Sequence, residues 1–264
     1  MIVSQYNILI ISVLSNFFIM HYGLLFLFLS CIVNAQGPLT KFGINMTNKS
    51  FAIGYYEKEG RQLATIPMIH VNKPEFYKMT KRKIDSLRND GYQVFYESID
   101  SNVTDSLQLD VLMRKFRQVT GFALMDYMDS ENETFKSLQK AKYVSQAEVD
   151  YGVNYKTDHH ADLYLEQMIE VFEKRFGEIK LTDCDNATPL GKKYKCSKVD
   201  NSKEYFILNK IRDRHVLDEI EKSSTKKIVV VFGRIHVMDL HSKLQKLGWQ
   251  HQREKTERIS NFNK

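Results

Sequence analysis

The residues of this sequence most able to do chemistry are two histidines in the same short phrase, Ile-His-Val, at His70 and His236. Each phrase ends an apolar run and precedes a helix-like segment, so we expect the two histidines at equivalent places in two related strand-His-helix units. Glu97 ends a third apolar run and can join them. Two imidazoles and a carboxylate can bind Zn²⁺, Mn²⁺, Co²⁺ or Fe²⁺ and leave a position open for water. We therefore predict His70, His236 and Glu97 as metal ligands and the bound water as a nucleophile.

Further roles complete the predicted catalytic set. Glu97 is either the third ligand or the general base that takes the proton of the water. Arg212 would stabilise the oxyanion on an attacked carbonyl, and Asp162 would orient an imidazole from outside the ligand set. A metal-free site stays open, with one histidine as general base and Glu97 tuning it. A structural interpretation also stays open, in which each histidine is hydrogen-bonded at a strand end and Glu97 pairs with a nearby cation.

Other histidines compete for the ligand role. His159 and His160 lie in a polar turn, and His241 would face another side of a helix than His236. The sequence contains no His-Glu-x-x-His, no Gly-x-Ser-x-Gly, no Walker loop and no dinucleotide-binding fingerprint. Any chemistry therefore belongs to the two repeated histidines and Glu97.

The elements that must position these residues predict an α/β fold with a mixed sheet. Four apolar runs are expected as strands, at residues 50–56, 63–69, 92–96 and 227–232. The first two would form a hairpin that turns at Glu59 and Gly60. In such sheets ligands bind at the carboxyl ends of parallel strands, where the three predicted ligands would lie.

Helical spacing of apolar residues predicts the remaining elements, which begin at about Pro74 and at 106–128, 134–146, 158–176, 205–221 and 239–247. Gly121 is expected to break the second of them, and residues 183–202 are expected as a loop. No low-complexity linker divides residues 36–264. We therefore expect a single domain with a helical insertion at about 103–180.

The first 40 residues contain no Lys, Arg, Asp or Glu, and residues 24–29 are wholly apolar. With Val-Asn-Ala before Gln36, this is typical of an export signal at 1–35, cleaved after Ala35. Met20 is an alternative start, Cys31 an alternative lipid-attachment site, and a retained membrane anchor the main rival. We expect a periplasmic or secreted protein, associated with a membrane only if this segment is retained.

Once residues 1–35 are removed, Cys184 and Cys196 are the remaining cysteines. In an oxidising compartment they are expected to form a disulfide, since a metal pair would need a nearby histidine and closer spacing. The net charge of +6 is spread among interleaved acidic and basic residues. A solvated surface explains it, and no aromatic-basic motif indicates nucleic acid as a partner.

Four motifs, in their chain order, resemble the TraB/PrgY/GumN family over about residues 51–250. They are Pro-Met-Ile-His at 67–70, Gln-Val-Phe-Tyr-Glu at 93–97, Arg-Asp-Arg-His at 212–215 and Gly-Arg-Ile-His at 233–236. This family is similar to the TIKI metalloproteases and to the wider erythromycin-esterase/ChaN-like fold group, whose halves each carry a Gly-x-x-His-like element. Pro67 replaces a glycine common in the family, and Asp213 replaces an asparagine.

The resemblance implies an exported, metal-dependent hydrolase that cleaves a peptide or related acyl bond, with a peptide or protein as substrate. The likeness to ChaN and PrgY implies an alternative: the same residues would hold haem, iron or a peptide signal without turnover. An interaction module with a vestigial site is a third alternative, to which the departure at Pro67 points. The sequence predicts neither the substrate nor how chains associate.

Overall fold

A tight hairpin opens the part of the chain that the structure describes. In this computed structural model, which describes residues 50–124 and 142–258, β1 (Ser50–Lys58) pairs antiparallel with β2 (Arg61–Met68). Glu59 and Gly60 between them have φ values of 50° and 74°, the left-handed conformation that a two-residue hairpin turn requires. The predicted hairpin is confirmed. Residues 1–49, which include the predicted signal at 1–35, lie outside the described residues.

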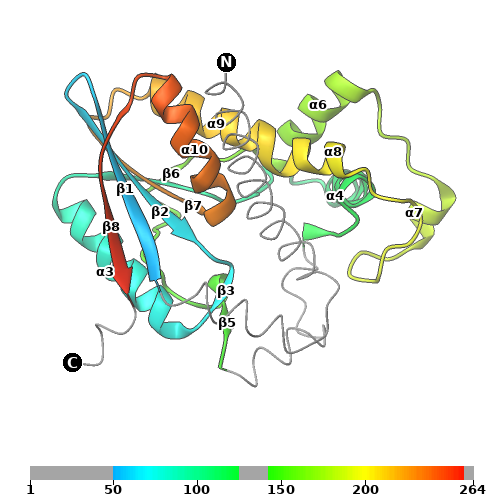
Figure 1. Ribbon diagram of the computed structural model, residues 1–264. Coiled ribbons are helices and arrows are strands. Elements are labelled where there is room, and N and C mark those ends of the chain that lie inside the picture. Colours follow the sequence, from blue (N-terminus) through cyan, green and yellow to red (C-terminus); the bar gives the residue numbers. More distant parts are fainter. Residues whose placement is uncertain (1–49, 125–141, 259–264) are drawn as a thin grey trace, which may run out of the picture. The chain divides into compact units, whose positions relative to one another are not determined.

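Six strands form one mixed sheet in the order β6-β4-β7-β2-β1-β8 (Figure 1). The strands that complete it are β4 (Gln93–Tyr96), β6 (His159–His160), β7 (Lys227–Gly233) and β8 (Gln250–Arg258). β6, β4, β7 and β2 are parallel, whereas β1 and β8 are antiparallel to their neighbours. The central β7 is buried on both faces, which explains its uninterrupted apolar run. The predicted α/β class with a mixed sheet is confirmed.

Helices cover both faces of the sheet (Figure 1). On one face α3 (Pro74–Asn89) packs Phe76 and Ile84 against the strands. On the other face α9 (Ile211–Lys222) and α10 (Arg234–Lys246) pack Ile220 and Leu240. Successive side chains of β7 alternate between these two cores, as the period of two in a strand requires.

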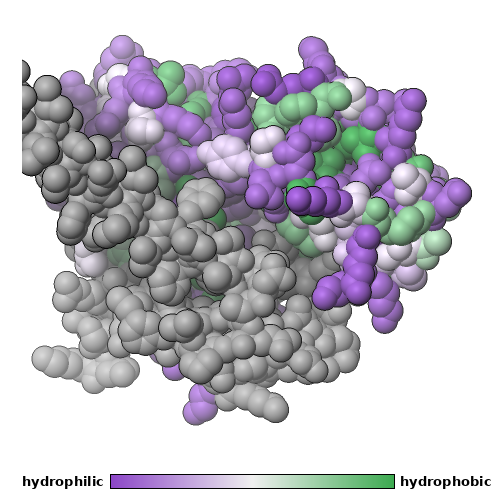
Figure 2. Space-filling model, turned by 45° about the vertical axis from the view of Figure 1, so that its right-hand side comes forward, coloured by the Kyte–Doolittle hydropathy of each residue, from purple (hydrophilic) through white to green (hydrophobic). Residues whose placement is uncertain are grey.

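A third core joins α4 (Ser106–Thr120), which follows β4 in the chain, to α6 (Leu165–Phe176) and the π-helical η3 (Phe206–Lys210), which continues into α9. The short helices α7 (Asp183–Ala187) and α8 (Asn201–Tyr205) lie between α6 and η3 in the chain. Phe116, Met168 and Ile207 are fully buried in it. α4 ends at Gly121, whose φ of 80° provides the left-handed end predicted there. Figure 2 shows apolar groups among the polar ones on the surface, and Leu107 on α4 is 78% exposed.

Several element boundaries differ from the prediction. His159 and His160 form the edge strand β6, and α6 begins only at Leu165, because backbone pairing with β4 prevails over local helical spacing. Most of the predicted helix at 134–146 lies outside the described residues. Where the structure describes its end, the chain forms the short strand β5 (Val144–Ser145), which pairs with β3 (Val71–Asn72). The one-turn helix η2 (Gln146–Glu148) follows β5 directly. The predicted loop at 183–202 contains α7.

The start of α10 is the difference that matters most for function. We predicted a helix from Asp239, but α10 begins at Arg234, directly after β7. Gly233 precedes it with no side-chain cap, so nothing in the local sequence marks the start. His236 therefore lies in the first turn of a helix rather than in a loop.

The disulfide predicted between Cys184 and Cys196 is present, with the two Cα atoms 5.7 Å apart. Arg114 and Arg117 of α4 donate hydrogen bonds to backbone carbonyls of the loop it closes. Within residues 50–124 and 142–258, no helix is both long enough and apolar enough to cross a membrane.

Candidate active site

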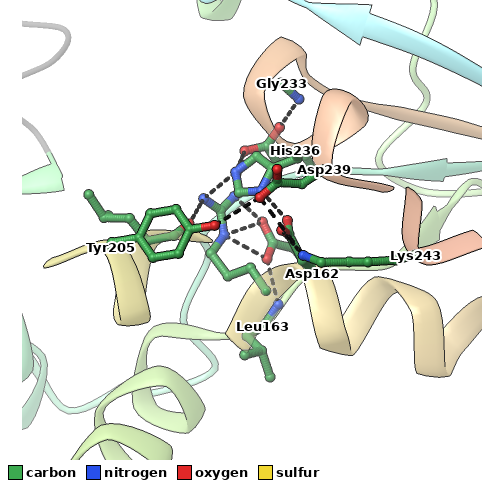
Figure 3. A network of polar contacts seen from close by, with 11 residues as sticks. Asp162, Leu163, Tyr205, Gly233, His236, Asp239 and Lys243 are labelled. Atoms are coloured by element: carbon green, nitrogen blue, oxygen red, sulfur yellow. Dashed lines mark hydrogen bonds and ion pairs between the residues drawn. The ribbon is translucent and has the colours of Figure 1, made fainter. Parts of the chain in front are cut away.

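Polar side chains gather where the parallel strands end. Glu97 follows β4, Asp162 lies two residues beyond β6, and His236 lies three residues beyond β7. Arg212 and Asp213 reach the same place from the first turn of α9. Hydrogen bonds and ion pairs join these side chains into one network. Figure 3 shows this network from close by, with Asp162 and His236 labelled in it. The network lies at the edge where open parallel sheets bind ligands.

Arg212 lies at the centre of the network and is only 5% exposed to solvent. Its Nε donates to Asp162 Oδ1 at 2.9 Å, and its Nη2 donates to Asp162 Oδ2 and Glu97 Oε1, each at 2.5 Å. Its Nη1 donates to the carbonyl of Leu208 at 3.0 Å and to Nε2 of His236 at 3.1 Å. All five N–H groups of the guanidinium are therefore in use.

The hydrogen bonds of His236 indicate the tautomer of its ring. A guanidinium only donates, so Nε2 of His236 accepts the bond from Arg212. Nδ1 then carries the proton and donates it to Asp213 Oδ1 at 2.6 Å. Asp213 is fully buried, and its other oxygen accepts from Lys243 at 2.6 Å. A neutral imidazole held this way has the orientation of a general base supported by a carboxylate.

Glu97 is ionised and held at both oxygens. Oε2 accepts the backbone N–H of Gly233, and a Cβ added at Gly233 would lie 3.1 Å from this oxygen, so glycine allows the close approach. Burial alone would raise the pKa of the Glu97 carboxyl, but Arg212, His236, His70 and the Gly233 N–H together lower it to about 2. A carboxylate with so low a pKa is a weak base. The geometry therefore favours His236 over Glu97 as proton acceptor.

Burial alone would lower the pKa of Arg212, but Asp162 and Glu97 raise it above its usual range. The guanidinium is therefore a permanent positive charge in a nearly buried place. Two carboxylates compensate this charge, so the cation is stable there, and removing Arg212 would leave two buried carboxylates without a cation.

The two repeated histidines have different surroundings. His70 lies in the link between β2 and β3 and is exposed, near enough to Glu97 to lower its pKa. His236 is in a helix and is 5% exposed. The structure thus brings together four of the five predicted residues, with Asp162 on the guanidinium of Arg212 rather than on an imidazole. Asp213 fills the role expected of Asp162.

Sequence reasoning missed Asp213 and Lys243. Asp213 directly follows Arg212. The TraB/PrgY/GumN family carries asparagine at this position, and this difference was the one sequence feature that could have pointed to Asp213. Lys243 follows His236 by seven residues, two helical turns, so both lie on one face of α10. Position on a common helix face could have linked Lys243 to the site once the start of α10 was known.

The competing histidines have other partners. Nε2 of His159 contacts Glu219 Oε2 at 2.8 Å, and Nε2 of His160 donates to the carbonyl of Ser98 at 2.7 Å. His241 contacts the hydroxyl of Tyr56. None of these contacts involves a residue of the network around Arg212, so these histidines lie outside the candidate active site.

A resident divalent ion does not fit this arrangement. Glu97 Oε1 and His236 Nε2 are 3.5 Å apart, a spacing that two ligands of one ion can have. However, Arg212 donates to both atoms, and Asp162 holds the guanidinium in place. Nε2 has a single lone pair, which cannot serve an N–H group and a metal at once. In the described part of the chain, no three His, Cys, Asp or Glu side chains form a metal-binding group.

No protein-family model, curated protein or solved structure matches the chain. The resemblance to the TraB/PrgY/GumN family therefore rests on the four motifs and on their order. Three of the motifs supply residues to the network: Glu97 from the second, Arg212 and Asp213 from the third, and His236 from the fourth. The chemistry open to this arrangement is proton transfer by His236 next to a fixed positive charge.

Proposed function

We propose that this chain is a hydrolase of peptide or related acyl bonds that uses His236 as its general base without a metal. The observation that carries the proposal is the buried Asp213–His236 pair, whose Nε2 faces Arg212 and Glu97. Two carboxylates flank this ring: Asp213 Oδ1 lies 2.6 Å from Nδ1, and Glu97 Oε1 lies 3.5 Å from Nε2. Asp213 is therefore placed to stabilise the imidazolium that forms when Nε2 takes a proton during the reaction.

Substrate binding would release the lone pair of His236. The hydrogen bond from Arg212 Nη1 to His236 Nε2 goes to a neutral acceptor, so it is weaker than the bonds that Arg212 donates to carboxylates. A substrate carbonyl that takes this N–H leaves Nε2 free to accept a proton from water. Arg212 would then stabilise the oxyanion, the role predicted for it from the sequence.

The reaction then proceeds in two proton transfers. The water oxygen bonds to the carbonyl carbon while His236 Nε2 takes a proton, and Asp213 stabilises the imidazolium. The imidazolium returns this proton to the leaving nitrogen as the carbon–nitrogen bond breaks. The products are an acid and an amine, and the ring is again neutral.

The metal-dependent version of this hydrolysis, implied by the family resemblance, is the alternative. It requires Arg212 to leave both Glu97 and His236, and we derive no step through a metal. The proposed internal repeat is supported by chain order on two neighbouring parallel strands, because His70 follows β2 and precedes α3, and His236 follows β7 and lies in the first turn of α10. Family membership and a helical insertion at about 103–180 are parts of this proposal.

Export to an oxidising compartment belongs to the same proposal. It is supported by the Cys184–Cys196 disulfide, since such bonds persist mainly outside the cytosol. A substrate met there would be a peptide or protein outside the cytoplasm.

The test is hydrolysis of an internally quenched peptide library and of p-nitrophenyl acetate by the full chain, with and without the chelator 1,10-phenanthroline. His236→Ala should lower the rate by about 10²–10⁴-fold, the contribution of a positioned base. His159→Ala, which removes a histidine that contacts Glu219 outside the network, is the matched control and should keep the rate. Unchanged activity of His236→Ala would refute the proposal. Activity lost in chelator and restored by Zn²⁺ would favour the metal-dependent version, and peptide binding without turnover the non-catalytic one.

A further inference from the structure

Three rings meet between α10 and the β1–β8 edge of the sheet, outside the network of the candidate active site. They belong to Tyr56 on β1, His241 on α10 and His251 on β8. We propose that His241 and His251 bind a transition metal ion of the Cu²⁺, Ni²⁺ or Zn²⁺ class, with Tyr56 orienting His241. This site is independent of the proposed hydrolase function.

The fold holds the two histidines at a fixed separation. Tyr56 and His251 are direct cross-strand partners on the antiparallel strands β1 and β8. α10 lies beside these strands (Figure 1) and places His241 over the pair. The ring centres of His241 and His251 are 5.1 Å apart, with the planes at 80°.

This separation of the ring centres is compatible with a shared ion. With metal–nitrogen bonds of about 2.0–2.1 Å and near-tetrahedral angles, two imidazoles on one ion have centres about 5 Å apart. Imidazole nitrogens suit Cu²⁺, Ni²⁺ and Zn²⁺. In the described ranges, no hydrogen-bond partner meets Nε2 of His241 or either ring nitrogen of His251. These nitrogens can therefore accept an ion without breaking an existing bond.

Tyr56 supplies the outer contact that metal-binding histidines usually have. Its hydroxyl lies 2.8 Å from Nδ1 of His241, so with Nδ1–H donating to this oxygen, Nε2 is left as the ligand atom. Tyr56 is only 4% exposed. A Cβ added at Gly54 would lie 2.9 Å from the Tyr56 hydroxyl, so the glycine leaves room for the ring in this position. The phenol is thus fixed before any metal binds.

Solvent can reach the proposed site and complete the coordination. His251 is exposed and His241 is half-buried, so an ion can enter from solution and keep water as its other ligands. Two protein ligands give an exchangeable site rather than a closed structural one. Its occupancy would follow the metal supply outside the cell if the chain is exported.

The test is Cu²⁺ binding to the full chain, followed by calorimetry and by electron paramagnetic resonance. We expect one ion with nitrogen splitting from two imidazoles. His251→Gln should weaken binding at least tenfold and reduce the splitting to one nitrogen. Tyr56→Phe should keep both nitrogens but weaken binding, as expected for a positioning residue. His159→Ala, which removes a histidine that contacts Glu219 elsewhere in the fold, should bind as the parent does.

Two outcomes would overturn the proposal: binding unchanged in His251→Gln, or binding lost in His236→Ala or His70→Ala and kept in His251→Gln. Circular dichroism of each variant checks that it folds. If a variant does not fold, a measurement on the parent protein tests the site instead. Zn²⁺ should protect His241 and His251 of the parent protein from diethylpyrocarbonate, mapped by mass spectrometry, and equal modification with and without Zn²⁺ would refute the site. Hydrolysis can fail its own test while this result stands.

Discussion

Glu97→Gln should destabilise the protein at neutral pH, and the loss should disappear in acid. The variant keeps the shape of the side chain and removes the charge that Arg212 and the Gly233 N–H stabilise. The pKa of Glu97 falls from 4.5 to about 2 in the folded chain. At about 1.4 kcal/mol per pH unit, this difference corresponds to about 3 kcal/mol of folding free energy. The Glu97 side chain is only 10% exposed, so solvent screening reduces this little.

The sign of the pH dependence follows from the direction of the shift. Because the folded pKa is lower than the unfolded one, the stabilisation is complete above about pH 4.5 and is lost as pH falls toward 2. Above pH 5 the parent should therefore exceed Glu97→Gln by about 3 kcal/mol, and near pH 2 the two should be similar.

Urea unfolding of parent and variant at pH 7, 5 and 3 measures this difference. Glu170→Gln is the matched control, since Glu170 is exposed on α6 and lies outside the network; its stability should change by no more than about 0.5 kcal/mol. Equal stability of parent and Glu97→Gln at pH 7 would refute the reasoning. So would a difference that stays the same from pH 7 to pH 3, because a lost charge–charge interaction must titrate.

Three further changes test other parts of the structure. Asp213→Asn no longer offers a carboxylate to Nδ1 of His236, so kcat/KM for peptide hydrolysis should fall by about 10²–10⁴-fold while circular dichroism is unchanged; full activity would contradict the role of the pair. Arg212→Met leaves two buried carboxylates unpaired and should cost about 3–5 kcal/mol in urea unfolding; a cost below about 1 kcal/mol would mean that the network is not buried as described. Cys184→Ser/Cys196→Ser removes a disulfide with a sequence separation of 12 and should cost about 3 kcal/mol and lower Tm; an unchanged Tm would contradict a stabilising bond.

Elements with a strong local signal could be predicted from the sequence. The apolar run that forms β7 predicted a buried strand, and Glu59-Gly60 between two apolar runs predicted a hairpin turn. β6 could not be predicted, because a two-residue strand has too few positions for a period and exists through its pairing with β4. The start of α10 was missed because Gly233 supplies no capping side chain.

The candidate active site could also be predicted only in part from the sequence. The order of the motifs pointed to Glu97, Arg212 and His236 as neighbours, since strand ends and their helices share one edge of an open sheet. The sequence could not show that Arg212 lies between Glu97 and His236, because this depends on how α9 packs on the sheet. The position of Arg212 between these two residues is the reason why we propose a metal-free general base rather than a metal site.

The most direct test of the central claim is the imidazole ¹H–¹⁵N NMR spectrum of His236 in the full chain, assigned with His236→Gln and recorded with and without Zn²⁺. The contacts with Asp213 and Arg212 predict a neutral ring, protonated at Nδ1 and unprotonated at Nε2. Its Nε2 resonance should not move when Zn²⁺ is added. A shift of this resonance on adding Zn²⁺ would mean that a metal displaces Arg212, and it would contradict the metal-free base.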